Sequence, residues 1–203
     1  MTGAATCWSR YGGVAQPPPG AYETGHCYQG AVCCGVAQGG SLSCWNAESG
    51  SSAVFSIETG IPTGSFADVA VLSDSSACAV SMSGSIECWG SATSFQTNRP
   101  LGGGFQRIGE TGGQFCAAGT LGGACWGSGG TDGTLVVPAG DYVQVVENTG
   151  LLVTGEVVVF DSSGLSRPGE LFSVIARGDP GLGVTTDGRI APTDGKGSYW
   201  PGR

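Results

Sequence analysis

Positive charge is scarce in this chain of 203 residues. Eight Lys and Arg residues stand against sixteen Asp and Glu residues, the formal net charge is −8 at pH 7, and His26 is the single histidine. A surface that binds nucleic acid needs clustered cations to neutralise phosphates, and the sequence has no such cluster. We therefore expect no nucleic-acid partner and attribute the acidity to solubility.

Long apolar segments are also missing. No run of about 18 apolar residues occurs, so we expect no helix that spans a membrane. The opening residues, MTGAATCW, carry neither the basic nor the apolar segment of a signal peptide. Nine cysteines nevertheless indicate an oxidising compartment. We expect a secreted or cell-surface protein whose signal peptide is absent from this sequence.

Helical periodicity is absent, whereas glycine is abundant. The 39 glycines follow no three-residue period, which excludes a collagen-like structure. Segments such as VVENTGLLVTGEVVVF combine glycines with β-branched residues, which disfavours a helix. Short apolar runs separated by turns such as SMSGS and TTDGR are typical of strands joined in hairpins.

One pattern, a glycine followed a few residues later by Cys-Trp, returns along the chain. Four copies keep both residues: Cys7-Trp8, Cys44-Trp45, Cys88-Trp89 and Cys125-Trp126. Two degenerate copies end at Val159-Phe160 and at Thr193, and successive copies are 33 to 44 residues apart. Their fixed place in the repeat predicts a structural role for Trp8, Trp45, Trp89 and Trp126.

An aromatic residue after a glycine turn opens each repeat, with an apolar residue three positions later. The aromatic copies are Tyr22, Phe66, Phe105 and Tyr142, and Leu171 with Val174 form a weaker fifth copy. The pattern of each unit predicts three or four short antiparallel strands. A single sheet of this size cannot bury both of its faces alone. Units stacked around an axis cover each other. We predict an all-β fold without a substantial helix, a β-propeller of about six blades.

The segment CAVSMSGSIECWG resembles the RCC1-type repeat, whose blades carry His/Cys-Ala-Leu, a glycine turn and Cys-Trp-Gly. Bacterial chains of this kind include the beta-lactamase inhibitory protein II. The resemblance implies a β-propeller over almost the whole chain. The family's Asn-Gly-Gln-Leu-Gly loop is missing here, and no residue matches the family's exchange-factor or chromatin-binding residues, so the resemblance assigns no active residue. Within a blade we place SIECWG, residues 85–90, on the inner hairpin strand.

The repeats divide a single domain, 1–203, into one partial and five full units. The expected limits are 1–21, 22–65, 66–104, 105–141, 142–170 and 171–203. Both ends carry the glycine-turn strand, so three completions of the array stay open: a reduced sixth blade, another copy of the chain, or a longer chain.

Six cysteines form three pairs with matched spacing around a glycine turn. These pairs are Cys34 with Cys44, Cys78 with Cys88, and Cys116 with Cys125. Neighbouring antiparallel strands can bring such residues within disulfide distance, and the last two units lose both cysteines together. We predict three disulfides. A zinc site would need closely spaced ligands or clustered histidines, so we expect no metal.

Cys7, Cys27 and Cys33 are left without an assigned partner. By the logic of the repeat, the partner of Cys7 would precede Met1. We favour a bond from Cys7 to Cys27 or Cys33, which leaves one odd cysteine for an intermolecular bond or a reactive thiol.

No catalytic constellation emerges from the sequence. A Ser-His-Asp triad has only His26 to use, no G-x-S-x-G motif occurs, and the carboxylates lie mostly beside turns. We predict no enzyme and no cofactor. The variable loops instead favour a scaffold that binds a protein partner.

Three functions are weighed for this scaffold. A protein-binding surface would use Phe55 and Phe95 in the long loops, although both can simply pack between blades. A lectin-type propeller would stack a glycan on the loop residues Tyr11, Tyr28, Tyr199 and Trp200. The third alternative is an extracellular structural protein that self-assembles through its ends and the odd cysteine.

Overall fold

The computed structural model is built almost entirely of short strands. It describes residues 7–8, 14–15, 17–28, 32–46, 55–91, 98–111, 113–127, 137–146, 149–160, 169–176 and 182–193. Within these ranges the only helical segment is one 3₁₀ turn, η1 (Ser56–Glu58). Among the described residues no helix is long and apolar enough to cross a membrane. The predicted all-β class is confirmed.

Five sheets follow one another along the chain, each with three antiparallel strands in sequence order. The first strands are β3 (Tyr22–Tyr28), β6 (Phe66–Ser73), β9 (Phe105–Thr111), β12 (Tyr142–Val146) and β15 (Phe172–Ala176). The second strands are β4 (Val32–Ala37), β7 (Ser76–Ser81), β10 (Gln114–Gly119), β13 (Thr149–Leu152) and β16 (Leu182–Thr185). The third strands are β5 (Leu42–Asn46), β8 (Ile86–Trp89), β11 (Gly122–Gly127), β14 (Val157–Val159) and β17 (Ile190–Pro192). A two-stranded pair, β1 (Cys7–Trp8) with β2 (Val14–Ala15), precedes them.

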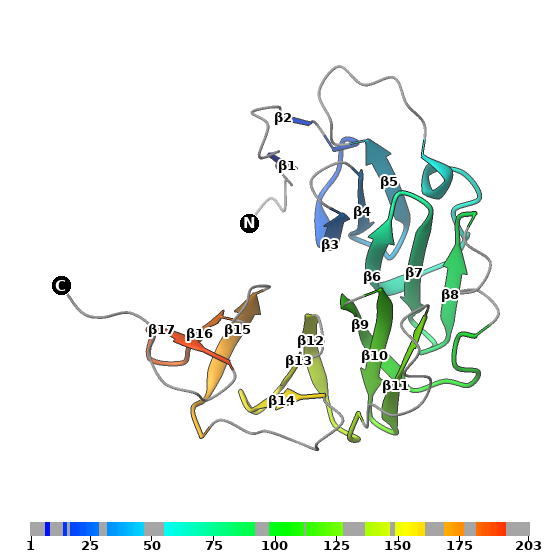
Figure 1. Cartoon of the computed structure of the whole chain (residues 1–203). Helices are drawn as coiled ribbons and strands as arrows, with labels where there is room; N and C mark the ends of the chain where they lie inside the picture. The colour runs from blue at the N-terminus through cyan, green and yellow to red at the C-terminus, as the bar shows by residue number, and fades with distance from the viewer. Residues whose placement is uncertain are drawn as a thin grey trace.

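The five sheets are arranged along an arc (Figure 1). The first strand of each sheet lies on the inside of the arc and the third strand lies on the outside. This is the blade arrangement of a β-propeller. The prediction that SIECWG forms an inner strand is therefore wrong. Its residues Ile86–Trp89 form β8, the outer strand of its sheet. The chain runs outward from the first strand, β6, which begins with the aromatic Phe66, through β7 to β8.

Each first strand contains a one-residue register irregularity directly after its aromatic residue. In β15 this irregularity falls between Phe172 and Val174. The aromatic of the fifth unit is thus Phe172, and the apolar residue three positions later is Ile175; both are buried. The assignment of Leu171 and Val174 to these positions is wrong. A shift of one residue moves a side chain to the opposite face of a strand, and both side chains are exposed.

Apolar clusters fill the four interfaces between consecutive sheets. The first interface packs Val36 of β4 against Phe66 and Val69 of β6. The last one packs Leu151 of β13 against Phe172 of β15. The three middle sheets therefore bury one face against the sheet before them and the other against the sheet after them, as expected for propeller blades.

The described tryptophans are part of this packing. Trp45, Trp89 and Trp126 are buried. Trp89 reaches back to the preceding sheet, and its Nε1 donates a hydrogen bond to the carbonyl of Ile57, 2.8 Å away. These contacts agree with the structural role expected for the Cys-Trp positions. The side chain of Trp8 lies outside the described residues.

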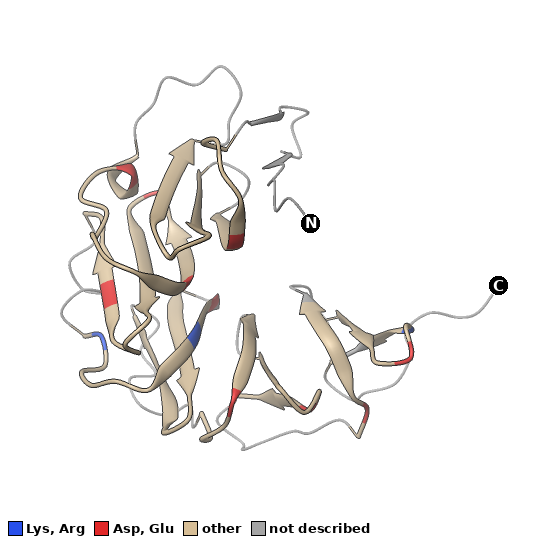
Figure 2. Cartoon of the chain, turned by 180° about the vertical axis from the view of Figure 1, so that it is seen from behind, with Lys and Arg blue, Asp and Glu red and all other residues tan. Residues whose placement is uncertain are grey.

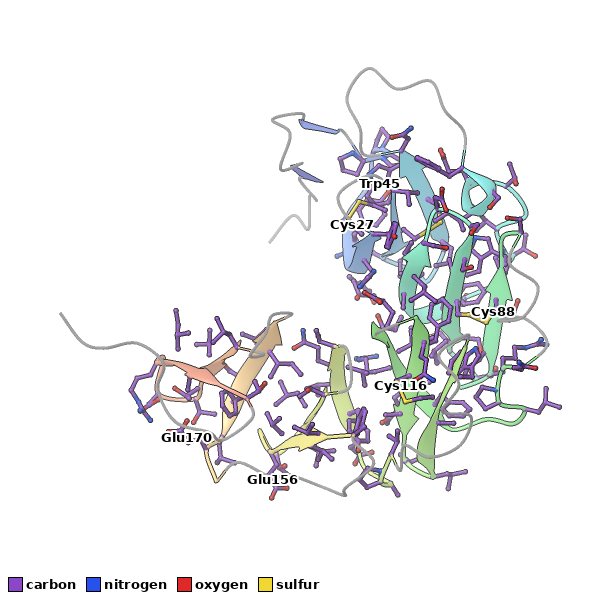
Figure 3. All side chains as sticks on the ribbon, viewed as in Figure 1. Cys27, Trp45, Cys88, Cys116, Glu156 and Glu170 are labelled. Carbon is purple, nitrogen blue, oxygen red and sulfur yellow. A yellow bond between two sulfur atoms is a disulfide. The ribbon has the colours of Figure 1, made fainter. Side chains whose placement is uncertain are left out.

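The three predicted disulfides are confirmed: Cys34–Cys44, Cys78–Cys88 and Cys116–Cys125 each join directly opposed residues of a second and a third strand (Figure 3). A fourth disulfide joins Cys27 of β3 to Cys33 of β4.

The preferred bond from Cys7 to Cys27 or Cys33 is therefore wrong. Cys27 and Cys33 face each other across the β3–β4 hairpin and are only six residues apart in sequence, so they pair with each other. Cys7 lies in β1, opposite Ala15 of β2, and takes part in none of the four described disulfides.

Candidate functional site

A repeated polar contact joins the inner strands of neighbouring sheets. It comes from the position two residues after each opening aromatic, which we call the bridge position. Its occupants are Thr24, Asp68, Arg107, Gln144 and, in the last sheet, Val174. The first four reach the inner strand of the next sheet, whose edge toward the inside of the arc would otherwise present unpaired backbone groups.

Asp68 is the most buried member of this series. Its Oδ1 accepts hydrogen bonds from the Thr24 hydroxyl and its own neighbour Val69 N–H, both at 3.0 Å, and its Oδ2 accepts one from Ile108 N–H at 3.1 Å. Burial raises the pKa of Asp68 above its usual 3.8, and the hydrogen bond from Ile108 and the nearby Arg107 charge only partly oppose that rise. A buried carboxylate with three donors serves to hold three strands together.

The other bridges use different chemistry at the same place. Arg107 Nε donates to the carbonyl of Val143 at 2.8 Å. Gln144 makes two bonds to one residue: its Nε2 donates to the carbonyl of Ile175 at 2.7 Å, and its Oε1 accepts from the same residue's N–H at 3.0 Å. The bridge position is thus conserved in geometry but not in residue type.

A cavity of about 330 Å³ lies among β3, β6, β9 and β12. Its polar lining includes Glu23, His26, Asp68, Arg107 and Gln144. Several of these groups are already engaged; His26 Nδ1, for example, accepts a hydrogen bond from Val71 N–H at 3.2 Å. Among the described residues no group of three or more His, Cys, Asp or Glu side chains could hold a metal ion. The geometry indicates that these side chains organise the strands.

A second surface forms at the end of the sheets where second and third strands are joined. We call it the turn face; it consists of these hairpin turns and the residues directly before each first strand. The two parts are tied together, because Met82 N–H donates to the carbonyl of Ser65 and Val153 N–H to that of Asp141, at 2.8 and 2.9 Å. The turn face is therefore a hydrogen-bonded surface rather than a set of free loops.

Glycine is required where this surface passes from one sheet to the next. Phe105 N–H donates to the carbonyl of Gly84 at 3.2 Å. Gly84 has φ +82°, and a Cβ atom there would lie 2.5 Å from the backbone nitrogen of Gly104. A side chain at Gly84 would thus be strained and would separate the two sheets.

Exposed aliphatic side chains gather on the turn face. They are Met82, Leu101, Leu121, Val153 and Leu171, between 47 and 87% exposed. Leu121 of the β10–β11 turn lies against Gly104, which leads into β9 of the same sheet. Leu171, which leads into β15, lies against Gly155 in the β13–β14 turn of the preceding sheet. Met82 and Val153 occupy the same position of their turns, since each donates its N–H to the residue before the first strand of its own sheet. Scattered exposed apolar residues are ordinary, but five of them at one end of successive sheets mark a candidate interaction surface.

Basic residues are sparse over the described part of the chain, and acidic ones are scattered over turns, strand ends and strands (Figure 2). Within the described ranges the basic residues are Arg99, Arg107 and Arg189. Arg189 forms exposed ion pairs with Asp187 at 2.9 Å and Glu170 at 3.4 Å. A hydrogen bond from the Thr185 hydroxyl, and then one from Arg189, lower the pKa of Asp187 to about 2. The described residues contain no basic cluster of the kind that binds phosphates.

Of the aromatic residues proposed from the sequence, the structure describes Tyr28 and Phe55, and neither belongs to the turn face. Phe55 and Tyr28 are half-buried and pack against the cluster between the first two sheets. Phe55 also precedes η1 and its N–H donates to Glu58 Oε1 at 2.8 Å. These contacts match packing between blades and leave a binding role untested. Phe95, Tyr11, Tyr199 and Trp200 lie outside the described residues.

No protein-family model and no curated protein sequence matches this chain. Solved structures do match it in fold. The CRINKLY WD40 ectodomain of the receptor kinase ACR4 from Arabidopsis thaliana aligns with a TM-score of 0.50 at 18% identity, over 83% of this chain and 58% of its own. Prp20p from Saccharomyces cerevisiae, studied for its binding to Gsp1p and histones, aligns with a TM-score of 0.52 at 10% identity, over 79% and 55%.

The computationally designed Ika8 protein gives a TM-score of 0.52 at 11% identity, over 80% of this chain and 55% of its own. The fold is that of a β-propeller, as predicted. This chain spans somewhat more than half the length of each of these structures. At such low identity the likeness establishes the fold alone, and membership of the RCC1-type family stays a prediction.

Proposed function

We propose that this chain is a secreted or cell-surface scaffold that recognises a protein partner through its turn face, without catalysis. The observation that carries the proposal is the set of five exposed aliphatic side chains at the same end of successive sheets. Burial of such side chains against a partner is favourable at about 25 cal/mol per Å² of apolar area.

The turn face also has the rigidity that a binding surface needs. Backbone hydrogen bonds link its turns to the following first strands, so little conformational freedom remains to be lost on binding. The propeller neighbours support a role in protein interaction in general, since Prp20p was studied with Gsp1p and histones. Four disulfides and the likeness to an ectodomain support an extracellular location.

The glycan alternative has less support among the described residues. Stacking on a sugar ring needs an exposed aromatic side chain. The exposed large apolar side chains of the described residues are all Met, Leu, Val or Ile. The remaining candidates, Phe95, Tyr11, Tyr199 and Trp200, lie outside them.

Affinity capture with two matched variants tests the proposal. Leu101→Arg with Leu121→Arg adds two charges to the turn face. Thr59→Arg with Ser91→Arg adds two charges to exposed positions beyond η1 and the far end of β8. Proteins captured from extracellular fluid of the source organism are cross-linked and quantified by mass spectrometry.

The proposal expects a captured protein that binds the Thr59/Ser91 variant normally and the Leu101/Leu121 variant at least about tenfold less, as charges would have to be desolvated in the interface. Equal binding to both variants, or binding on a glycan array without any protein partner, would overturn it.

A further inference from the structure

The disulfide between Cys27 and Cys33 differs from the other three described disulfides in its exposure. Cys27 is exposed on β3 (labelled in Figure 3), whereas the outer-strand cysteines Cys44 and Cys88 are half-buried and Cys125 is buried. The second-strand member of every pair is buried. Cys27 is thus the most exposed of the eight cysteines in these bonds, and exposure is what makes a disulfide accessible to an attacking thiol.

A pocket of about 280 Å³ lies beside Cys27. Its lining includes the aromatic rings of Tyr22 and Trp45, whose centroids are 5.5 Å apart, together with the polar residues Glu23 and Thr24. This volume is at the small end of the range for ligand pockets. The pocket therefore suits a thiol of low molecular mass better than a folded protein.

The β3–β4 ladder keeps the two cysteines together without their bond. Cys27 and Cys33 are directly opposed, and the pairs on either side of them, His26 with Cys34 and Tyr28 with Val32, belong to the same ladder. Opening of the disulfide therefore leaves both sulfurs on neighbouring strands in register. The bond can form again without a search for the partner.

The adjacent Cys34–Cys44 disulfide is separated from this bond by the strand itself. Cys33 packs with Trp45 on one side of the β3–β5 sheet. Cys34 points to the other side, into the cluster shared with β6. Successive side chains of a strand alternate in this way, so a free thiol at Cys33 is kept from the Cys34–Cys44 bond.

The blade does not need this bond for its fold. No other described first strand carries a disulfide, yet all five sheets have the same strand order. Its loop, with a sequence separation of six, is the shortest of the four described, and the stabilisation expected from chain entropy rises with loop length. The Cys34–Cys44 bond continues to join β4 to β5 when the Cys27–Cys33 bond is open.

We propose that the Cys27–Cys33 disulfide is a thiol-exchange site, at which a thiol of low molecular mass forms a mixed disulfide with Cys27. The thiolate of the incoming molecule attacks Cys27 Sγ, the bond between the two cysteine sulfurs breaks, and Cys33 leaves with the electron pair and takes up a proton. Cys33 can then attack the mixed disulfide and expel the thiol. Alternatively, a second molecule of the thiol attacks it, which leaves both cysteines reduced and the two thiol molecules joined as their own disulfide.

Timed alkylation of the folded full chain carrying Cys7→Ser, kept in reduced glutathione, tests the proposal. Samples are quenched with acid, alkylated and digested, and tandem mass spectrometry locates the label on each cysteine. We expect label on Cys27 and Cys33 at least about tenfold faster than on the cysteines of the other three bonds, because those bonds are less exposed. Circular dichroism should stay unchanged meanwhile. Opening of all four bonds at one rate, or a loss of strand signal in step with the Cys27–Cys33 bond, would overturn the proposal.

A matched pair of variants tests the direction of attack. In the Cys7→Ser chain, Cys33→Ala leaves only the exposed thiol of Cys27, and Cys27→Ala leaves only that of Cys33, which is 1% exposed. With oxidised glutathione, Cys27 is expected to form the mixed disulfide at least about tenfold faster than Cys33. Equal rates, or a faster reaction at Cys33, would contradict attack at Cys27. The alkylation experiment keeps both cysteines and decides the matter even where one of these variants fails to fold.

Discussion

The three sheets from β3 to β11 and the two sheets from β12 to β17 share one register but are stabilised by different chemistry. In the first three, a disulfide joins the second and third strands and a tryptophan follows the outer cysteine. In the β12–β14 sheet, Thr149 and Val159 oppose each other at the disulfide position, and Phe160 takes the place of the tryptophan. The strand order and the aromatic opening are nevertheless the same.

This difference separates what specifies a blade from what reinforces it. The elements common to all five sheets are the opening aromatic, the irregularity after it and the glycine turn. The disulfides occur only where the outer strand also carries tryptophan. We infer that packing between sheets determines the fold and that the disulfides add stability to three of the blades.

The largest expected effect comes from removing a large side chain that fills an interface between two sheets in each region. Trp89→Ala and Phe160→Ala are both expected to lower the free energy of unfolding by about 3–5 kcal/mol, because each leaves a cavity between two sheets. Trp89→Phe is a control that keeps most of the volume but leaves the Ile57 carbonyl without its donor, a cost of about 1–3 kcal/mol. Urea unfolding followed by circular dichroism measures all three.

If Phe160→Ala costs far less than Trp89→Ala, the last two sheets are not packed as the first three are. The common role given to the two positions would then fail.

Removing one disulfide tests the reinforcing role directly. The double variant Cys78→Ala with Cys88→Ala is expected to lose about 2–3 kcal/mol, the chain-entropy value for a loop of ten residues. Hydrogen exchange should show the loss of protection concentrated in β6–β8, with β12–β17 little changed. An equal loss over all five sheets would mean that the molecule opens as one unit and that the two regions do not differ in this respect.

The repeat made much of the fold predictable from the sequence. Cys34, Cys78 and Cys116 have partners nine or ten residues later across a glycine turn, and such spacing leaves few arrangements other than a cross-strand pair. The Cys27–Cys33 disulfide was not predicted, because no other first strand carries a cysteine and the repeat gave no precedent for it.

Side-chain direction was harder to predict than strand order. Leu171 and Phe172 are both apolar, and composition does not tell which of them opens the last strand. The bridge position was not predicted from the sequence, because threonine, aspartate, arginine and glutamine have little in common except a polar group on a side chain of suitable length. The distance of two residues from each aromatic was the available signal, and it emerges only once the register is known.

The bridge between the last two sheets gives a smaller test of the cysteine-free region. Gln144→Leu keeps the approximate size of the side chain and leaves the N–H and carbonyl of Ile175 without their partner. We expect a loss of about 1–3 kcal/mol in the free energy of unfolding. Gln144→Glu retains an acceptor for the N–H but places a carboxylate near the carbonyl, so its stability should improve as the pH falls and the new side chain becomes protonated. A Gln144→Leu protein as stable as the wild type would show that packing alone holds these sheets.

The smallest expected effect concerns pH and the corresponding bridge in the disulfide-bonded region. Burial raises the pKa of Asp68 in the folded chain, while the unfolded chain ionises near the usual 3.8. Between these two values only the folded state holds the proton, so the contribution of Asp68 to stability is present below the lower pKa and is lost as the pH rises through the raised one.

Asp68→Asn has no such transition. The difference in unfolding free energy between wild type and Asp68→Asn should therefore shift against the wild type as the pH rises from 4 and level off once Asp68 is ionised. Urea unfolding of both proteins at matched pH values measures this difference. A shift in favour of the wild type would mean that the hydrogen bonds from Thr24, Val69 and Ile108 stabilise the carboxylate more than burial destabilises it.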